Sequence, residues 1–180
     1  IIHRDIKPEN LFETSDGMVK VLDFGIARLM EGTGGTTAAT RAGSVMGTPA
    51  FMAPEQACGY WDKVDARTDL WAVGATLFTL LTGRHVHEGE TVNIQLGKAI
   101  TAEAPSVAGI LPELQPEVAA LVDRALSRSR EDRWQSARDV AQELRWIGES
   151  GSQVNVAAPL AARRTRRDRL AWSVAAIAGI

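Results

Sequence analysis

Cysteine and histidine are scarce in this sequence, and their shortage excludes two kinds of structural support. Cys58 is the only cysteine among 180 residues, so no disulfide forms within the chain, which fits a reducing compartment. With one cysteine and three histidines, a structural zinc site is not expected. Charge of one sign is also lacking: the formal net charge of −2 gives no general attraction to nucleic acid, and we expect no nucleic-acid partner.

The start of the chain lacks the features of a targeting segment. It begins with Ile1 and Ile2, without an initiator methionine, and no signal-peptide pattern follows. A motif of charged residues follows at once, so we expect the sequence to be part of a longer protein. Its length is enough for one domain.

One polar stretch near the start has the layout of a site that handles phosphate. Asp5, Lys7 and Asn10 lie within six positions, and Asp23 follows at the end of an apolar run. Asp5 is a candidate acceptor for the proton of a hydroxyl, and Lys7 is a candidate to offset charge on a phosphoryl group in transfer. Asn10 and Asp23 offer the hard oxygen ligands that Mg²⁺ prefers.

Three motifs, in this order, resemble the catalytic domain of protein kinases. They are His-Arg-Asp-x-x-x-x-Asn at 3–10, Asp-Phe-Gly at 23–25, and the segment from Gly-Thr to Ala-Pro-Glu at 47–55. Lys7 and the Gly-Thr pair resemble Ser/Thr kinases rather than Tyr kinases. The resemblance covers residues 1–148 and is to the eukaryotic-like (Hanks-type) bacterial Ser/Thr protein kinases.

The resemblance implies transfer of the γ-phosphoryl group of ATP to Ser or Thr of protein substrates, with Mg²⁺. It implies catalytic roles for Asp5, Lys7 and Thr48, cofactor contacts by Lys7, Asn10 and Asp23, and metal contacts by Asn10 and Asp23. The alternative is a pseudokinase that binds nucleotide or partners without transfer. The intact catalytic residues argue against it, although the amino-terminal lobe of a kinase, with its Gly-rich loop and strand Lys, does not occur in the sequence. We therefore expect the 180 residues alone to be inactive.

Residues 31–44 are rich in Gly, Thr and Ala, which predicts a flexible loop. Composition alone also fits a plain linker, but the position between two kinase motifs resembles an activation loop. The candidate phosphorylation sites are Thr40, then Thr37, with Ser44 also near the segment 47–55, which resembles the family's substrate-docking segment. By resemblance, Arg4 would pair with the phosphate and order the loop. Self-association, in which one copy phosphorylates another, is a further expectation.

The predicted fold class is mainly α, a kinase-like C-lobe with a small β-hairpin next to the catalytic loop. Apolar runs on both sides of Asp16-Gly17 predict the hairpin. The segment from Thr68 to Gly83 is apolar on nearly every face, which indicates a buried helix with Thr68 as its N-cap. Further helices are expected from Pro54, over 91–100 and 116–126, and from Ser136 through Ile147, with a loop over 102–116.

Three more positions take structural roles from the resemblance. Asp69 would bind the backbone of the catalytic loop, although an acidic residue in a first helical turn needs no such role. Arg133 would pair with Glu55, the alternative being an exposed connector arginine.

The stretch 84–90 departs from the Pro-Phe pair common in the family, and its two histidines, His85 and His87, are expected to be exposed.

The end of the chain predicts a linker with a basic segment at 149–169, followed at 170–180 by the start of a transmembrane helix. Eleven residues cannot cross a bilayer, which needs about 20. Five arginines between 163 and 169 and Trp172 fit the flank of a membrane span. The parent protein would then be a receptor-type kinase, cytoplasmic in its kinase region and single-pass in the inner or plasma membrane. A disordered basic tail or an amphipathic surface segment are the alternatives.

Overall fold

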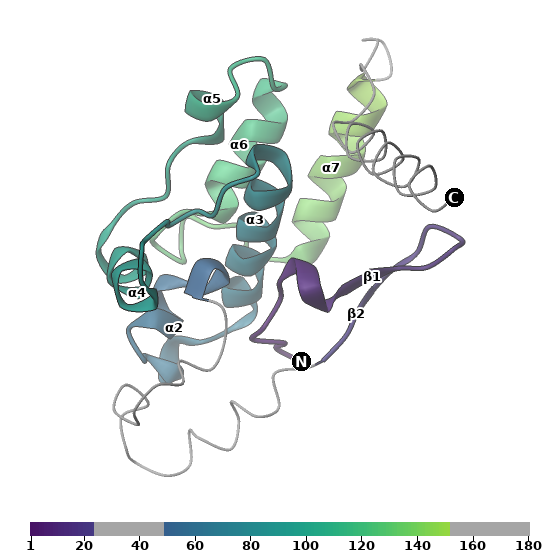
Figure 1. Cartoon of the computed structure of the whole chain (residues 1–180). Coiled ribbons are helices and arrows are strands. Elements are labelled where there is room, and N and C mark those ends of the chain that lie inside the picture. Colours follow the sequence, from purple (N-terminus) through teal and green to yellow (C-terminus); the bar gives the residue numbers. More distant parts are fainter. Residues whose placement is uncertain (24–48, 152–180) are drawn as a thin grey trace, which may run out of the picture. The chain divides into compact units, whose positions relative to one another are not determined.

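The computed structural model describes residues 1–23 and 49–151 of the chain (Figure 1). The chain divides into two units, Ile1–Arg145 and Trp146–Ile180, and the packing below is that of the first. As predicted, the described residues are mainly helical, with one sheet of two strands. In chain order the elements are η1 (Pro8–Asn10), β1 (Leu11–Glu13), β2 (Val19–Val21), η2 (Pro49–Phe51), α2 (Pro54–Ala57), η3 (Trp61–Lys63), α3 (Ala66–Thr82), α4 (Val92–Thr101), α5 (Val107–Ile110), α6 (Pro116–Ala125) and α7 (Ala137–Gly151).

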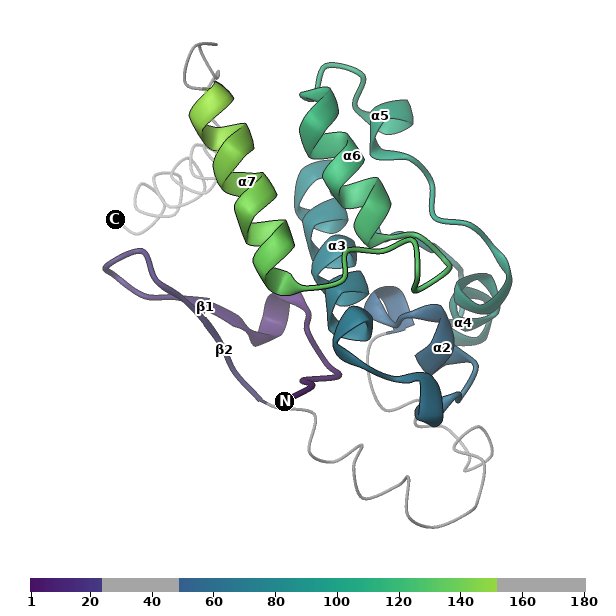
Figure 2. The ribbon, with the colours of Figure 1, turned by 180° about the vertical axis from the view of Figure 1, so that it is seen from behind.

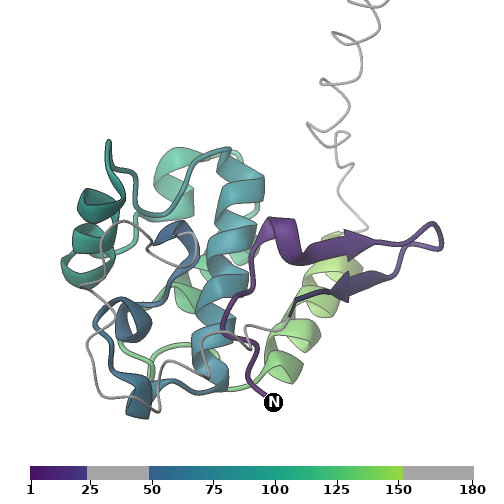
Figure 3. The same cartoon turned by 60° about the horizontal axis from the view of Figure 1, so that its bottom comes forward.

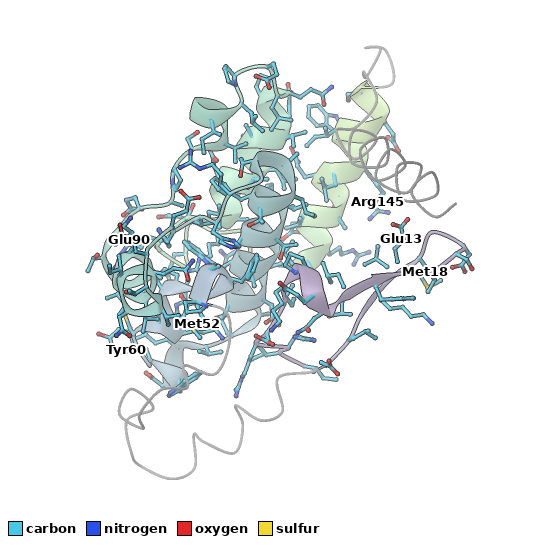
Figure 4. The ribbon with its side chains drawn as sticks, in the orientation of Figure 1. Glu13, Met18, Met52, Tyr60, Glu90 and Arg145 are labelled. Atoms are coloured by element: carbon cyan, nitrogen blue, oxygen red, sulfur yellow. The ribbon has the colours of Figure 1, made fainter. Side chains whose placement is uncertain are left out.

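The predicted hairpin is confirmed, and it projects from the side of the unit opposite α2 and α4 (Figures 1 and 3). Strands β1 and β2 are antiparallel, with Leu11 opposite Val21. In the turn, the backbone N–H of Thr14 donates to the carbonyl of Met18 at 2.9 Å, and Gly17 takes a φ of 79° that suits glycine. Met18 projects from the tip of the hairpin (Figure 4).

Helix α3 is confirmed, but the predicted N-cap is wrong. The cap is Asp65, whose carboxylate accepts from the backbone N–H of Arg67 at 2.8 Å. Thr68 lies one turn further on, and its hydroxyl accepts from the backbone N–H of Asp65 at 3.2 Å. The two residues form a capping box, so the helix begins before Thr68. It ends as predicted at Gly83, whose φ is 72°.

The core lies where α3 packs against α6 (Figure 2). Gly74 allows the close approach, because a Cβ atom there would lie 2.8 Å from the Cβ of Ala125. Trp71 and Phe78 of α3 and Leu121 of α6 are each 1% exposed. Burial of side chains of this size is worth about 1.5–3 kcal/mol each, so this seam is the main support of the unit.

Two segments between the long helices differ from expectation. The stretch 102–116, predicted as a loop, contains the short helix α5. Asp123 of α6 holds it, accepting from the Ser106 hydroxyl at 2.6 Å and from the backbone N–H of Val107 at 2.9 Å. His87, predicted to be exposed, is only 5% exposed, whereas His85 is exposed as expected.

Helix α7 starts as predicted, with the Ser136 hydroxyl accepting from the backbone N–H of Asp139 at 3.2 Å. It continues to Gly151, so the first residues of the linker predicted from 149 are helical. Among the residues that the structure describes, no helix is both long and apolar enough to cross a bilayer. The predicted membrane segment at 170–180 lies outside the described residues.

Candidate active site

The loop over residues 3–10, called the catalytic loop after the motif that it resembles, gathers three of the predicted site residues around one carboxylate oxygen. Lys7 Nζ lies 3.3 Å from Asp5 Oδ2, and Asn10 Nδ2 donates to the same oxygen at 3.2 Å. Asn10 Nδ2 also donates to the backbone carbonyl of Asp5 at 2.7 Å. The single turn η1 places Asn10 for these bonds, and Pro8 begins it with a fixed φ. Asp5 is therefore held in place by one cation and one amide donor on the same oxygen.

The hairpin brings Asp23 back to this loop. The backbone N–H of Leu22 donates to the carbonyl of Asn10 at 2.8 Å, and His3 Nε2 lies 3.0 Å from the carbonyl of Leu22. Because a carbonyl only accepts, His3 carries its proton on Nε2, and its Nδ1 accepts from the backbone N–H of Asp5 at 3.3 Å. His3 thus ties the residue before Asp23 to the loop that holds Asp5.

Two side chains from the helices fix the backbone of the catalytic loop. The carboxylate of Asp69, in the first turn of α3, accepts from the backbone N–H of His3 at 2.7 Å and of Arg4 at 2.8 Å. Gln56 of α2 donates from Nε2 to the carbonyl of Arg4 at 3.0 Å. Hydrogen bonds to a charged group are worth about 1.5–3 kcal/mol, so Asp69 is the stronger anchor.

Backbone strain is concentrated at the same site. Among the described residues other than glycine, positive φ occurs at Arg4, with 69°, and at Asp23, with 52°. Such residues cost of order 1–3 kcal/mol and persist where their surroundings hold them, often at functional sites. Here the anchors on both sides of Arg4 and the bonds at Leu22 supply that restraint.

A buried ion pair holds the segment that follows. Glu55 of α2 accepts from Arg133 twice, at 2.8 Å from Nη1 and 2.9 Å from Nη2, and from the Thr68 hydroxyl at 2.7 Å. Burial of Glu55 acts to raise its pKa, but the bonds and charge of Arg133 and the bond from Thr68 outweigh it and hold the pKa below its usual value.

Comparison with known proteins shows the family. Residues 1–146 match the protein kinase domain. The chain belongs to the protein kinase domain family. It is 40% identical over 144 residues to a probable serine/threonine-protein kinase of Streptomyces coelicolor, matching 80% of this chain and 21% of that protein. It is also 40% identical over 153 residues to the serine/threonine-protein kinase pkn3 of Myxococcus xanthus, and 37% over 145 residues to PknB of Mycobacterium tuberculosis.

The kinase domain described here is a small share of each relative's length. The match covers 82% of this chain and 28% of pkn3, and 80% of this chain and 22% of PknB. The chain thus spans between 21% and 28% of these curated relatives, all three of which are named as Ser/Thr protein kinases.

Two residues of this kinase domain have the right donor atoms for Mg²⁺. Because Asn10 uses its amide nitrogen on Asp5, the Oδ1 atom remains as its acceptor, and Asp23 follows the hairpin as an exposed carboxylate. Hard oxygen donors of this kind, completed by phosphate and water, suit Mg²⁺. Within 1–23 and 49–151, no cluster of three or more His, Cys, Asp or Glu forms a metal site from protein groups alone.

The described part of the segment 47–55, which the resemblance identifies as the docking segment, is mostly buried and contacts α4. Pro49, Ala50 and Phe51 of η2 are buried, and α4 contacts both η2 and α2. The ring of His85 meets that of Phe51 edge to face, with 5.5 Å between centroids. Figure 4 shows Met52 near α2 and Glu90 in the loop before α4.

Four predicted site residues, Thr37, Thr40, Ser44 and Thr48, lie outside the described residues. Two residues that sequence reasoning missed lie in the site. His3 stood within a motif already quoted, so its position was a usable signal. Gln56 had none, because its bond to Arg4 joins residues 52 positions apart.

Proposed function

We propose that the protein containing this chain transfers the γ-phosphoryl group of ATP to Ser or Thr hydroxyls of protein substrates. The observation that carries the proposal is the gathering of Lys7 and Asn10 on one carboxylate oxygen of Asp5, at 3.3 and 3.2 Å. A carboxylate fixed in this way has one orientation toward an incoming hydroxyl. Positioning and charge stabilisation account for most of the catalysis of phosphoryl transfer.

Each group has one role in this proposal. Asp5 orients the substrate hydroxyl and accepts its proton, and Lys7 stabilises negative charge on the phosphoryl group. Asn10 Oδ1 and the Asp23 carboxylate would hold Mg²⁺, which when bound neutralises charge on the phosphate oxygens. Thr48 would complete the substrate side of the site. Asp69 and Gln56 act indirectly, because they hold the backbone that carries Asp5.

Regulation and location belong to the same proposal. Phosphate on Thr40, Thr37 or Ser44, added by a second copy of the kinase, would pair with Arg4 and order the activation loop.

The basic segment and the apolar residues 170–180 would anchor the protein in the membrane with its kinase region in the cytoplasm. The 180 residues by themselves would transfer little or no phosphate, because they contain no Gly-rich phosphate loop.

Incorporation of labelled phosphate from ATP tests the function. The experiment uses the complete kinase region with Mg²⁺ and a generic protein substrate, beside an Asp5→Asn variant. Asp16→Asn, the same change in the exposed hairpin turn, is the matched control. Incorporation that falls to background in Asp5→Asn and stays at the wild-type level in Asp16→Asn supports the proposal. No incorporation in any of the three would indicate a pseudokinase instead.

A further inference from the structure

One buried titratable side chain takes no part in the catalytic arrangement. His87, in the loop between α3 and α4, is 5% exposed, and its Nε2 has no hydrogen-bond partner among the described residues. Buried polar atoms are nearly always bonded, so an unpaired one needs an explanation. Either tautomer leaves Nε2 unsatisfied, as a donor in one and as an acceptor in the other.

The loop around His87 is fastened to α4. Gln95 donates from Nε2 to the carbonyl of His87 at 2.8 Å, and Lys98 donates from Nζ to the carbonyl of Glu88 at 2.7 Å. Gly89 lies so close to α4 that a Cβ atom there would be 2.8 Å from the backbone nitrogen of Gln95. Loop and helix are therefore one packed body, and a change at His87 reaches α4.

This body supports the docking segment by two routes. Helix α4 contacts η2 directly, and His85 of the loop packs its ring edge against Phe51 of η2. Phe51 is 5% exposed, so its position depends on these neighbours. A loop that moves away from α4 would separate His85 from Phe51 and break the bonds from Gln95 and Lys98 that fasten α4 to the loop.

The charges near His87 disfavour its protonated form. Burial first, then the positive charges of Arg128 from the connection after α6 and of Lys98 from α4, lower the pKa of His87. On its own loop, His85 is exposed and Arg84 pairs with Glu88 at 2.9 Å. A proton on His87 would thus add a buried charge beside two cations, and its Nε2–H would have no acceptor among the described residues.

We propose that neutral His87 is a positioning residue for the docking segment, and that His87 loses this role when it is protonated. The neutral ring packs the 84–90 loop and α4 against Pro49–Phe51, and the imidazolium is expelled toward water. This proposal depends on the proposed function in one respect: the ligand of the docking segment is a protein substrate. Its consequence is that acid weakens substrate binding more than ATP binding.

The kinetic test compares the KM for a peptide substrate and the KM for ATP in the complete kinase. Because one linked proton changes binding by up to about tenfold per pH unit, we expect the peptide KM to rise by about threefold or more once the pH falls from about 7.5 to below the midpoint of His87. The KM for ATP should change less than about twofold in the same range. His87→Phe and His87→Gln, one apolar and one polar, should both remove the rise. A rise that persists in both variants overturns the proposal.

A second set of measurements tests the role of His87 without an assay of phosphate transfer. Amide hydrogen exchange over 49–57 and 92–101, corrected for the intrinsic effect of pH, should speed up in acid in the wild type and not in His87→Phe. NMR titration should place the His87 midpoint below the ordinary value of about 6.5. A midpoint at or above that value, or exchange that does not respond, overturns the proposal. Absence of phosphate transfer at every pH would instead count against the proposed function.

Discussion

Two Arg–Glu pairs in this domain have almost the same separation and opposite surroundings. Arg133 and Glu55 lie 2.8 Å apart, with side chains 0% and 5% exposed. Arg84 and Glu88 lie 2.9 Å apart, with side chains 57% and 50% exposed. Distance therefore does not distinguish them. Burial does, because a buried charge without its partner is costly, whereas water replaces a lost partner at the surface.

The buried pair also joins more of the chain. Arg133 donates to the carbonyls of Ser127 at 2.8 Å, Arg67 at 3.2 Å and Arg128 at 3.1 Å, besides Glu55. It thereby links α2, the start of α3 and the connector after α6. The exposed pair joins residues four positions apart in one loop. The comparison teaches that the first pair fixes the position of α2, whereas the second lies at the surface and joins no separate elements.

The largest effect is expected from Arg133→Met, which leaves Glu55 buried without its cation. The free energy of unfolding should fall by about 3–5 kcal/mol. Chemical denaturation of the chain, followed by the fluorescence of its tryptophans, measures the change. Met keeps much of the volume of the arginine stem, so the loss reports charge rather than a cavity.

The double variant Glu55→Leu with Arg133→Met is the control for that loss. It removes both charges, and apolar replacements of buried ion pairs are often neutral. We expect it to be more stable than Arg133→Met alone. If the two are equally destabilised, packing or the carbonyl bonds of Arg133 matter more than the stranded carboxylate.

The second largest effect is expected from acid, which should lower the contribution of the buried pair to the free energy of unfolding. The folded pKa of Glu55 lies below its usual value, so the unfolded chain takes up this proton first as the pH falls. Its contribution is complete above the unfolded value of about 4.3 and declines below it, by up to about 1.4 kcal/mol per pH unit. Denaturation midpoints at falling pH measure this, with Glu55→Gln as the comparison. A decline of equal steepness in Glu55→Gln would assign it to other carboxylates.

A smaller loss is expected from Thr68→Val, which removes the hydroxyl that donates to Glu55 at 2.7 Å. Thr68 is 1% exposed, so its bond is shielded from water and its loss should cost about 1–3 kcal/mol. Thermal unfolding measures it. Part of the loss comes from the capping box, because the backbone N–H of Asp65 loses the Thr68 hydroxyl as its acceptor. The prediction fails if Thr68→Val matches the wild type.

Sequence reasoning reached the elements of this fold more readily than the fine placement of polar groups. The turn at Asp16-Gly17 and the apolar runs of α3 and α6 are local patterns, and they predicted those elements. The cap of α3 was misplaced because Asp65 and Thr68 are both good caps, and only their mutual bonds decide between them. His87 was misplaced because its polar, glycine-containing loop predicts exposure, whereas bonds from Gln95 and Lys98 fasten that loop to α4.

The candidate site divides in the same way. The order of Asp5, Lys7 and Asn10 predicted a shared chemistry, and the structure places them around one oxygen. The pairing of Glu55 with Arg133 joins residues 78 positions apart, and nothing local in the sequence indicates it. That expectation came from the family resemblance alone. Long-range polar contacts depend on how helices pack, which periodicity does not determine.

The smallest effect is expected from Arg84→Met, which breaks the exposed pair at almost the same separation as the buried one. Water solvates the Glu88 carboxylate that remains, so the denaturation midpoint should stay at the wild-type value in low and high salt.

The Arg84→Met variant also tests whether the position of the 84–90 loop depends on this pair. Its anchors are the bonds from Gln95 and Lys98 to the carbonyls of His87 and Glu88, and Arg84→Met leaves them intact. Amide exchange over 92–101 should therefore keep the acid response of the wild type. A midpoint that falls as far as in Arg133→Met would show that separation, rather than burial, sets the contribution of an ion pair in this domain.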